Sequence, residues 1–363
     1  MKIGVVGGGQ LGRMLALAGY PLGLECRVLE SSTASPAGQV AECVEGQYDD
    51  PVALERFTRG LAVATYEFEN VPAQTAHFLQ TRLPVYPPPL ALETAQDRLA
   101  EKTLFARLGI PVPAFAPVDS QEQFAAALEQ IGLPAVLKTR RLGYDGRGQA
   151  LLRTRAEADK AWAEMSSVPL ILEGFVDFER EVSLIAVRGR QGESACYPLV
   201  ENHHREGILR LTLAPAPHLS LVLQEEAENY TRQVLEALDY VGVLAIEFFQ
   251  YEGRLLANEM ACRVHNSGHW TIEGAQISQF ENHLRAVAGL PLGSTQPRGY
   301  SAMFNLIGEL PDTRAILSCA GIHLHLYGKD PRPRRKLGHL TLVADTWAGL
   351  KASLPTAQSL VDS

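Results

Sequence analysis

Two glutamates, Glu247 and Glu259, flank a segment with the pattern of two apolar strands joined by a tight turn at Glu252-Gly253. With the turn centred on Gly253, each glutamate is six residues from the centre. Their side chains would then lie opposite each other on one face of a hairpin, about 5 Å apart. Two ionised carboxylates at that spacing repel by roughly 3 kcal/mol at an effective dielectric near 20. A divalent cation bound between the two carboxylates would replace this repulsion by attraction. Hard oxygen ligands of this kind suit Mg²⁺ that is shared with substrate phosphates. The alternatives are a shared proton or an arginine neighbour such as Arg263.

A polar segment follows the second glutamate: Arg263-Val264-His265-Asn266-Ser267-Gly268-His269. Its two histidines are four residues apart, but the intervening Asn-Ser-Gly favours a loop, so a metalloprotease pair is disfavoured. Hydrogen-bonded structural histidines are the alternative interpretation. The segment Glu201-Asn202-His203-His204 also offers two imidazoles without a third ligand at a useful spacing, so we expect no zinc site.

Lys138 closes a buried strand and precedes a glycine-rich turn, Gly143–Gly148. A lysine there can place a point charge on nucleotide phosphates beneath a glycine-rich flap. The alternative is a lysine that snorkels to solvent. Tyr144, Asp145 and Arg147 are polar side chains that a simple hairpin turn does not require. The pattern therefore favours a function for this flap.

The segment Gly7-x-Gly9-x-x-Gly12 follows a first strand, and Glu30 ends the second, which is the dinucleotide-binding fingerprint. Alone it would indicate an NAD-dependent dehydrogenase, but that interpretation gives the glutamate hairpin and the flap no role. The same helix N-terminus suits any phosphate or ribotide. The polar side chain of Gln10 is expected to point into this crevice. A tight turn needed only for helix packing is the remaining alternative.

Two further segments have compositions suited to a nucleotide or an anion. Glu173–Val176 follows a strand and leads to Glu181. Backbone groups of such an extended connector can hydrogen-bond to the edge of an adenine ring, and a carboxylate can accept hydrogen bonds from two ribose hydroxyls. A solvated face is the alternative for each of these residues. Arg332–His339 is the basic cluster of the chain. A targeting signal or nucleic-acid patch is possible there, but its prolines and the acidic background favour a clamp for a phosphate.

The composition is that of an ordinary soluble globular protein. The chain has 363 residues, 46% hydrophobic and 20% charged, with a formal charge of -8, so we expect two or three domains and no nucleic-acid binding. We expect no targeting signal and no membrane span. Five cysteines are scattered without paired metal spacing, which favours reduced thiols in a cytoplasm.

Hydrophobic periodicity divides the chain into three parts. The first is α/β with a parallel sheet. We expect its strands at 2–6, 26–29 and 61–66, a helix that follows Gly12 and runs to about Gly19, and a second helix at 72–79. A Pro-rich boundary at 84–89 and a helix at 96–108 follow. The second part is α+β, and we expect its strands at 135–138, 149–152, 170–172, 182–188, 195–199 and 208–213 and an amphipathic helix at 220–238. A small third unit has expected strands near 302–307, 323–326 and 340–343.

Together these motifs resemble the 5-(carboxyamino)imidazole ribonucleotide synthase family, the biotin-independent carboxylating enzymes of purine biosynthesis in the ATP-grasp superfamily. The most specific matches are Gly9-Gln10-Leu11-Gly12-Arg13-Met14, Tyr144-Asp145-Gly146-Arg147-Gly148, Arg263–Trp270 and Arg335-Lys336-Leu337-Gly338-His339. The glycine motif alone is weak, whereas the ordered set is specific and runs through nearly the whole chain. The resemblance implies an α/β pre-ATP-grasp domain at 1–98, an α+β ATP-grasp domain at 99–294 with a flap at 142–149, and a small β-rich C-terminal domain at 295–363.

The resemblance also implies roles for individual residues. Glu247 and Glu259 would carry Mg²⁺, with Mn²⁺ as a substitute. The residues implied to contact ATP are Arg98, Lys138, Gly143, Tyr144, Asp145, Gly146, Arg147, Gly148, Gln149, Glu173, Gly174, Phe175, Val176, Glu181, His204, Asn258 and Glu259. Those implied to bind the ribonucleotide are Gln10, Leu11, Glu67, Asn266, Arg335 and Lys336. The implied catalytic set is His265, Arg263, Arg147, Tyr144, Asp145 and Lys336.

The implied reaction uses ATP and bicarbonate to carboxylate 5-aminoimidazole ribonucleotide, releasing ADP and phosphate without biotin. Bicarbonate attacks the γ-phosphate, carboxyphosphate releases CO₂ in a closed site, and the amine captures it. His265 or the released phosphate would take the amine proton. We expect a cytoplasmic homodimer that binds neither nucleic acid nor membranes. The alternatives are another ATP-grasp ligase or transformylase acting on a different ribonucleotide, or a non-catalytic nucleotide-binding regulator.

The sequence departs from the family pattern at three positions. Cys262 stands where proline is usual before Arg263, and Leu142 replaces the first glycine of the flap. Arg334 stands where glycine is common beside Arg335. None of the three removes a matched functional residue, although turnover could differ from that of relatives.

Overall fold

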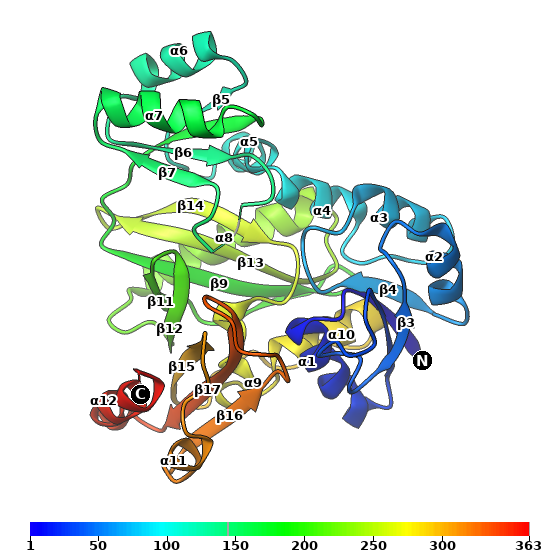
Figure 1. The fold of residues 1–363 in the computed structure, drawn as a ribbon. Helices are drawn as coiled ribbons and strands as arrows, with labels where there is room; N and C mark the ends of the chain where they lie inside the picture. Colours follow the sequence, from blue (N-terminus) through cyan, green and yellow to red (C-terminus); the bar gives the residue numbers. More distant parts are fainter. Residues whose placement is uncertain (144, 363) are drawn as a thin grey trace.

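The computed structural model describes residues 1–143 and 145–362. Its N-terminal part is an α/β unit whose four described strands run parallel in the order β3-β2-β1-β4 (Figure 1). The strands are β1 (Lys2–Val6), β2 (Glu25–Glu30), β3 (Glu42–Glu45) and β4 (Val63–Tyr66). The helical segments are α1 (Gln10–Gly19), η1 (Tyr20–Leu22), α2 (Pro51–Thr58), α3 (Ala73–Gln80), α4 (Pro89–Gln96) and α5 (Arg98–Arg107). The predicted parallel sheet is therefore confirmed.

A small antiparallel sheet with two helices stands above the rest of the molecule in Figure 1. Within the described chain its strand order is β5-β8-β6-β7. Its elements are β5 (Phe115–Val118), α6 (Gln121–Ile131), β6 (Ala135–Thr139), β7 (Gln149–Leu152), α7 (Arg155–Met165) and β8 (Leu170–Gly174). Its own apolar core packs α6 and α7 on the sheet, with Phe124 stacked on Trp162. The flap joins β6 to β7, so this unit holds the flap over the molecule below.

The largest sheet has nine strands among the described residues, in the order β14-β13-β9-β11-β12-β15-β17-β16, with β10 paired to β9. Its first members are β9 (Arg180–Arg188), β10 (Ser194–Cys196), β11 (Val200–Arg205), β12 (Ile208–Ala214), β13 (Gly242–Tyr251) and β14 (Arg254–Ala261). The helical segments of this part are α8 (Leu221–Ala237), η2 (Asn266–Gly268), α9 (Thr271–Gly274) and α10 (Gln279–Ala288). Strands followed by separate helices match the predicted α+β class.

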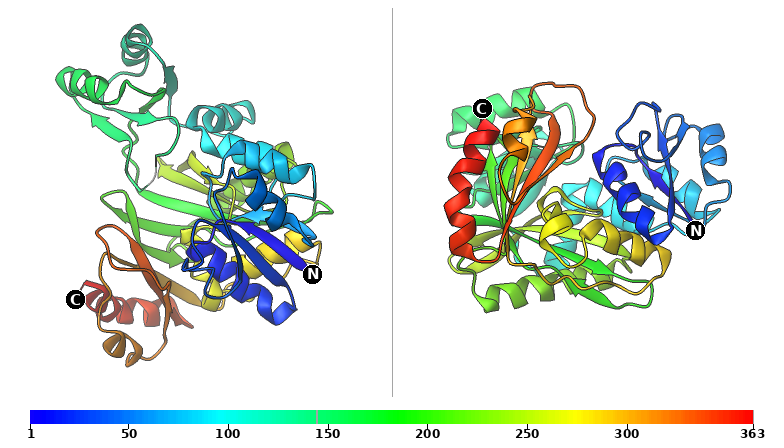
Figure 2. Two further views of the ribbon diagram at one scale, coloured as in Figure 1. Left: turned by 45° about the vertical axis from the view of Figure 1, so that its right-hand side comes forward. Right: turned by 90° about the horizontal axis from the view of Figure 1, so that it is seen from below.

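The C-terminal strands continue this sheet, since β15 pairs with β12. The elements are β15 (Tyr300–Ile307), α11 (Thr313–Leu317), β16 (Ile322–Leu326), β17 (Lys336–Ala344) and α12 (Trp347–Asp362). In both views of Figure 2, the blue N-terminal unit and the red helix α12 lie on opposite sides of the molecule. The boundaries at 98/99 and 294/295 stay predictions. Among the helices that the structure describes, none has both the length and the apolar character of a membrane span.

Several predicted elements differ in extent, and capping or proline explains most of the differences. The helix expected at 96–108 begins at Arg98, because the side chain of Asp97 caps it by accepting from the Leu99 N–H. The Pro-rich stretch is more than a boundary: Val85 bridges to Ala64, and α4 begins at Pro89, the favoured first position for proline. The strand expected at 195–199 ends at Cys196, close to Pro198, which has no N–H to donate.

Candidate active site

A cavity of about 450 Å³ lies where the N-terminal unit, the flap and the large sheet meet. Most of the predicted site residues line it. They are Gln10, Leu11, Glu67, Arg98, Lys138, Gly143, Asp145, Gly146, Gln149, Glu181, His204, Glu247, Asn258, Glu259, Arg263, His265, Asn266 and Lys336. The fold thus brings together residues that are more than three hundred positions apart in the sequence.

The glutamate hairpin has the predicted facing pair, since Glu247 is the register partner of Glu259 across β13 and β14. The turn at Glu252-Gly253 is also confirmed, with positive φ angles of 49° and 69°. That two-residue turn pairs Tyr251 with Arg254, so a regular ladder would place Asn258 opposite Glu247. A β-bulge after Glu247 shifts the register by one residue and makes Glu259 the partner. The spacing prediction is therefore correct because of a bulge that the sequence did not reveal.

The two carboxylates have different electrostatic surroundings. Burial, and then the charge of Glu259, raise the pKa of Glu247 to about 8. Burial also acts on Glu259, but Arg98, whose Nη1 lies 2.8 Å from Oε2, holds the pKa of Glu259 below its usual value. Beside them, Asn258 Oδ1 is buried without a hydrogen-bond partner in the described part of the chain. Two facing carboxylates and an unpaired amide oxygen are a donor set that fits a hard divalent cation.

Lys138 points into the cavity from the end of β6. Its Nζ donates to Glu173 Oε2 at 2.9 Å, and Lys102 Nζ lies 3.4 Å from the same oxygen. Burial opposes ionisation of Glu173, but the two lysines lower its pKa to about 2. Glu173 therefore stays ionised and anchors both ammonium groups, one of which faces the cavity.

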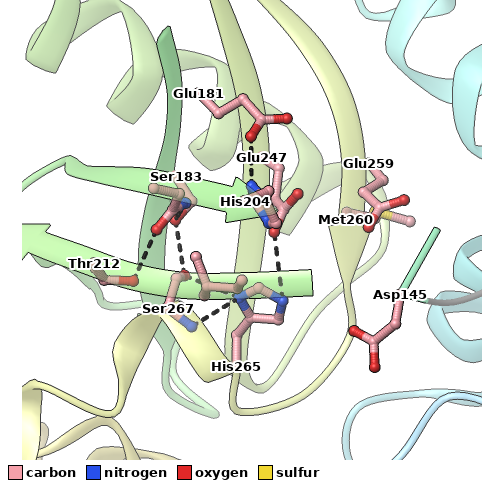
Figure 3. Close-up of polar contacts among 12 residues, drawn as sticks. Asp145, Glu181, Ser183, His204, Thr212, Glu247, Glu259, Met260, His265 and Ser267 are labelled. Atoms are coloured by element: carbon pink, nitrogen blue, oxygen red, sulfur yellow. Dashed lines mark hydrogen bonds and ion pairs between the residues drawn. The ribbon is translucent and has the colours of Figure 1, made fainter. Parts of the chain in front are cut away.

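His204 and His265 both belong to the group of polar side chains around Glu247, and dashed lines in Figure 3 join Glu181 to His204 and Glu247 to His265. His204 Nδ1 contacts Glu181 Oε2, and although burial lowers the pKa of His204, Glu181 and Glu247 together raise it. His265 Nε2 lies 3.6 Å from Glu247 Oε1. Burial, and then Arg263, lower the pKa of His265 well below its usual value.

Arg263 and Asn266 add polar groups to the same wall. Arg263 forms an ion pair with Glu69 at 2.7 Å, which fixes a buried guanidinium. The side-chain nitrogen and oxygen of Asn266 are both buried without a partner within the described residues. Unpaired amide groups that line a cavity are available to a bound polar ligand.

The flap is held by the C-terminal part of the chain. Lys336 Nζ donates to Asp145 Oδ1 at 2.8 Å. Arg334 Nη2 donates to the Asp145 carbonyl at 2.8 Å and to the Glu206 carbonyl at 3.2 Å. Gly146 packs so closely on Gly207 that a Cβ added at Gly207 would lie 2.6 Å from the Gly146 Cα. Tyr144, a predicted site residue, lies outside the described residues.

Comparison with known proteins places these features in one family. Three family models match in order: the "Ribonucleotide synthetase preATP-grasp domain" at residues 1–96, the "ATP-grasp domain" at 103–280 and the "Phosphoribosylaminoimidazole carboxylase C-terminal domain" at 301–353. The N5-carboxyaminoimidazole ribonucleotide synthase of Pseudomonas aeruginosa is 54% identical over the full length of both chains. The chain belongs to the N5-carboxyaminoimidazole ribonucleotide synthase family. This is the family that the motifs resembled, under its other name.

Solved structures of N5-carboxyaminoimidazole ribonucleotide synthases have the same fold. The crystal structure of the Thermus thermophilus enzyme has a TM-score of 0.96 and 61% identity, covering 99% of each chain. The Aspergillus clavatus enzyme in complex with ADP and 5-aminoimidazole ribonucleotide has a TM-score of 0.93 and 32% identity, covering 99% of this chain and 98% of that chain. The predicted fold class is confirmed.

In this synthase family member, protein carboxylates accept from three N–H groups of the glycine motif at the start of α1. Glu67 accepts from the Gly9 N–H at 2.8 Å and from the Gly12 N–H at 3.0 Å. Glu30 accepts from the Gly8 N–H at 2.9 Å. Protein carboxylates thus occupy the donors that a pyrophosphate would use, and the dehydrogenase interpretation is wrong.

Backbone N–H groups at the end of β8 and directly after it bond to neighbouring segments of the protein. The Gly174 N–H donates to the Ala114 carbonyl, and the Phe175 N–H donates to the Pro134 carbonyl. Phe175 is 42% exposed, and Val176 follows it. In the flap, the Gly148 carbonyl accepts a hydrogen bond from the Thr139 N–H. The roles of these residues toward ATP stay predictions.

A second cavity of about 380 Å³ adjoins Gln10 and the flap and carries the basic cluster. It is lined by Gln10, Asp145, Arg147, Lys329, Arg332, Pro333, Arg334, Arg335 and Lys336. Sequence reasoning missed Lys329, which donates to Gln10 Oε1. Burial lowers the pKa of Lys329 to about 8. Its position three residues before the predicted cluster was the available signal, but Asp330 and Pro331 separate it from the run of arginines.

Proposed function

We propose that this chain carboxylates 5-aminoimidazole ribonucleotide, using ATP and bicarbonate, to N5-carboxyaminoimidazole ribonucleotide in purine biosynthesis, with release of ADP and phosphate. The observation that carries the proposal is the facing pair Glu247 and Glu259 beside Lys138, in a cavity next to a basic one. One cavity suits a metal-bound triphosphate, and the other suits a sugar phosphate.

Mg²⁺ fits the hairpin, where Glu247, Glu259 and the oxygen of Asn258 would hold it. When bound, it would neutralise charge that develops on the transferring phosphoryl group. Lys138 is placed to add a second positive charge to the phosphates, because Glu173 fixes its ammonium group. Mn²⁺ offers the same charge and prefers the same ligands.

The wall of the cavity that carries Arg263 and Asn266 suits an anionic intermediate. Arg263 keeps its charge because Glu69 pairs with it, and the Asn266 amide is available for hydrogen bonding. The flap, held through Asp145, can exclude water from carboxyphosphate, which water would otherwise destroy. Bicarbonate, rather than dissolved CO₂, is the proposed carbon source because carboxyphosphate forms by its attack on ATP.

We further propose that the enzyme is a homodimer without biotin and that it acts in the cytoplasm. The location is supported by the cysteines: Cys26, Cys43, Cys196, Cys262 and Cys319 are all free thiols in the described structure. The assembly is supported only by the family resemblance, and sedimentation velocity tests it directly.

The deciding experiment measures ADP release with Mg²⁺, ATP and bicarbonate, with and without 5-aminoimidazole ribonucleotide. ADP release should rise sharply only with the ribonucleotide and should vanish in Glu259→Gln. Glu252→Gln, an exposed glutamate in the turn of the same hairpin, is the matched control and should keep full activity. ADP release that ignores the ribonucleotide would indicate a different acceptor, and no ADP release at all would refute catalysis.

A further inference from the structure

A row of buried hydroxyl and amide groups runs across the large sheet to His265 (Figure 3). Thr212 Oγ1 lies 3.0 Å from Asn202 Oδ1, and Asn202 Nδ2 lies 2.9 Å from Ser183 Oγ. Ser183 Oγ lies 2.7 Å from Ser267 Oγ, which lies 2.9 Å from His265 Nδ1. All four side chains before the histidine are buried. We refer to Thr212, Asn202, Ser183 and Ser267 as the polar row.

One backbone group fixes the direction of every hydrogen bond in the polar row. The Ser267 N–H points at His265 Nδ1 at 3.3 Å, and a backbone N–H can only donate. Nδ1 is therefore an acceptor and carries no proton in the neutral ring. The Ser267 hydroxyl must then donate to Nδ1, so its oxygen accepts from the hydroxyl of Ser183.

The same logic continues along the sheet. Because the Ser183 hydroxyl donates to Ser267, its oxygen accepts from the amide nitrogen of Asn202. The amide oxygen of Asn202 therefore faces Thr212 and accepts from its hydroxyl. Each side chain has one partner in the required role. The reverse arrangement, with a proton on Nδ1 and the Asn202 amide turned over, pairs the same side chains but leaves the Ser267 N–H without Nδ1 as its acceptor.

We propose that the polar row consists of positioning residues that hold the His265 proton on Nε2, so that this imidazole serves the reaction as a hydrogen-bond donor and not as a base. Nε2 faces the cavity and lies 3.6 Å from Glu247 Oε1. Because Nδ1 accepts from the Ser267 N–H, the ring proton is on Nε2, and Nε2–H is the group that the ring presents to the cavity. This role in the reaction rests on the proposed function, whereas the tautomer does not.

The proposal decides between the two proton acceptors that the sequence left open. A ring nitrogen that already carries a proton has no lone pair with which to take another from the amine. The amine proton then goes to the phosphate released when carboxyphosphate loses CO₂. His265 instead donates to an oxygen of the bound anion, a contact that is strongest where negative charge develops.

The first test is ¹⁵N NMR of the histidine side chains in the unliganded full-length protein, with His265 assigned from the spectrum of His265→Asn. We expect Nδ1 of His265 to resonate as an unprotonated nitrogen and Nε2 as a protonated one. The reverse pattern would overturn the proposal whatever the enzyme carboxylates, so it is separable from failure of the proposed function.

The second test uses Asn202→Asp to reverse the direction of the hydrogen bonds along the polar row. A carboxylate only accepts, so it would draw the hydroxyls of Thr212 and Ser183 toward itself, and the Ser267 oxygen would then accept from Nδ1–H. We expect the proton to move to Nδ1 and kcat to fall about 10²-fold, the usual cost of losing one preorganised donor. The KM for ATP should not change, because Lys138 and Arg98 are untouched. An unchanged tautomer in a folded variant would refute the role of the row.

Two further variants keep the test decisive if that protein does not fold. Ser183→Ala frees the Ser267 oxygen to accept from Nδ1–H and should give a mixture of both tautomers. Asn282→Asp places the same change at another buried asparagine, which bonds Tyr197 and Gly293 instead. It should lower the melting temperature but leave the His265 nitrogens as in the parent, and a tautomer shift in this control would count against the polar row.

Discussion

Lys329 is a half-buried cation whose titration should couple ribonucleotide binding to pH. Burial lowers its pKa to about 8, while the charge of Glu67 opposes that shift. The cation should help to hold the phosphate of the ribonucleotide in the second cavity, so binding should weaken as it deprotonates. We predict that kcat/KM for the ribonucleotide falls above pH 8, since this ratio reports the free enzyme. Lys329→Arg should abolish the fall, because guanidinium does not titrate there, and a fall that persists would contradict the assignment.

The same lysine should cost stability at neutral pH. Its pKa in the folded protein lies below the unfolded value, so the unfolded chain binds more protons between about pH 8 and 10.5. The free energy of unfolding should therefore rise with pH across that window, and the penalty is fully present at pH 7. Lys329→Met should raise the urea midpoint at pH 7 and lose this pH dependence while impairing ribonucleotide binding.

The residues that the sequence revealed are those whose chemistry shows in a local pattern. Glu247 and Glu259 flank a recognisable turn, and Lys138 precedes a glycine-rich segment. Lys102 and Glu69 form part of the site only through tertiary contacts with Glu173 and Arg263. Neither has a local spacing that predicts its partner, so sequence reasoning missed both.

At the scale of elements, α5 holds the bulged edge strand β14. Glu101 Oε1 accepts from the Met260 N–H at 2.5 Å, and Lys102 Nζ donates to the Ala257 carbonyl at 3.2 Å. These contacts lie on either side of Asn258, the additional residue of the bulge. Because β14 is at the sheet edge, α5 supplies partners that a further strand would otherwise provide.

We predict that Glu101→Ala destabilises the protein by about 1–3 kcal/mol, since the Met260 N–H loses its acceptor in a buried site. Hydrogen exchange of the Met260 amide should accelerate more than that of neighbouring strands, and more Mg²⁺ should be needed for half-maximal ADP release. Glu101→Gln keeps an acceptor oxygen and should be milder. Leu104→Ala, a buried residue of the same helix, should lower stability without selective exchange at Met260.

Arg334, which contacts the flap, has a strained backbone conformation. Its φ of 65° is in the left-handed region, where a side chain costs about 1 kcal/mol relative to glycine. We predict that Arg334→Gly raises the melting temperature but lets water reach carboxyphosphate, so that more ADP forms per carboxylated product. Arg334→Ala keeps the strain and should increase ADP per product without the gain in stability. An unchanged ratio in both variants would show that the flap does not need this contact.

Element positions were predictable where periodicity or capping is strong, as for β1, α1 and α8. The start of α4 was not, because Pro89 belongs to a Pro-rich stretch whose composition alone resembles a linker. The start of α5 was predicted two residues too early, because the capping role of Asp97 was not recognised. The β-bulge in β14 could not be predicted from the sequence for a different reason. It depends on contacts from α5, a helix about 150 residues earlier in the chain.

At the scale of the whole molecule, the large sheet joins regions that the sequence presents as separate units. Periodicity predicts individual strands near 302–307 and 340–343, but it contains no information about their partners. The structure pairs β15 with β12 and places Leu213 of β12 in one apolar core with Phe304 and Leu342. Pairing between distant strands is a tertiary property, so the continuity of the sheet could not be predicted.

This continuity has a consequence for unfolding. Phe304 is 2% exposed and packs in the core shared by β12, β15 and β17. Phe304→Ala should cost about 3–5 kcal/mol through lost burial and the cavity left behind. Because hydrogen bonds cross from β12 to β15, we predict that calorimetry shows the main transition moving to lower temperature, without an early separate transition for the C-terminal part. Leu326→Ala, at a more exposed position on the outer strand β16, should shift the transition much less. A separate early transition in Phe304→Ala would instead show that the C-terminal region unfolds as an independent domain, despite the shared sheet.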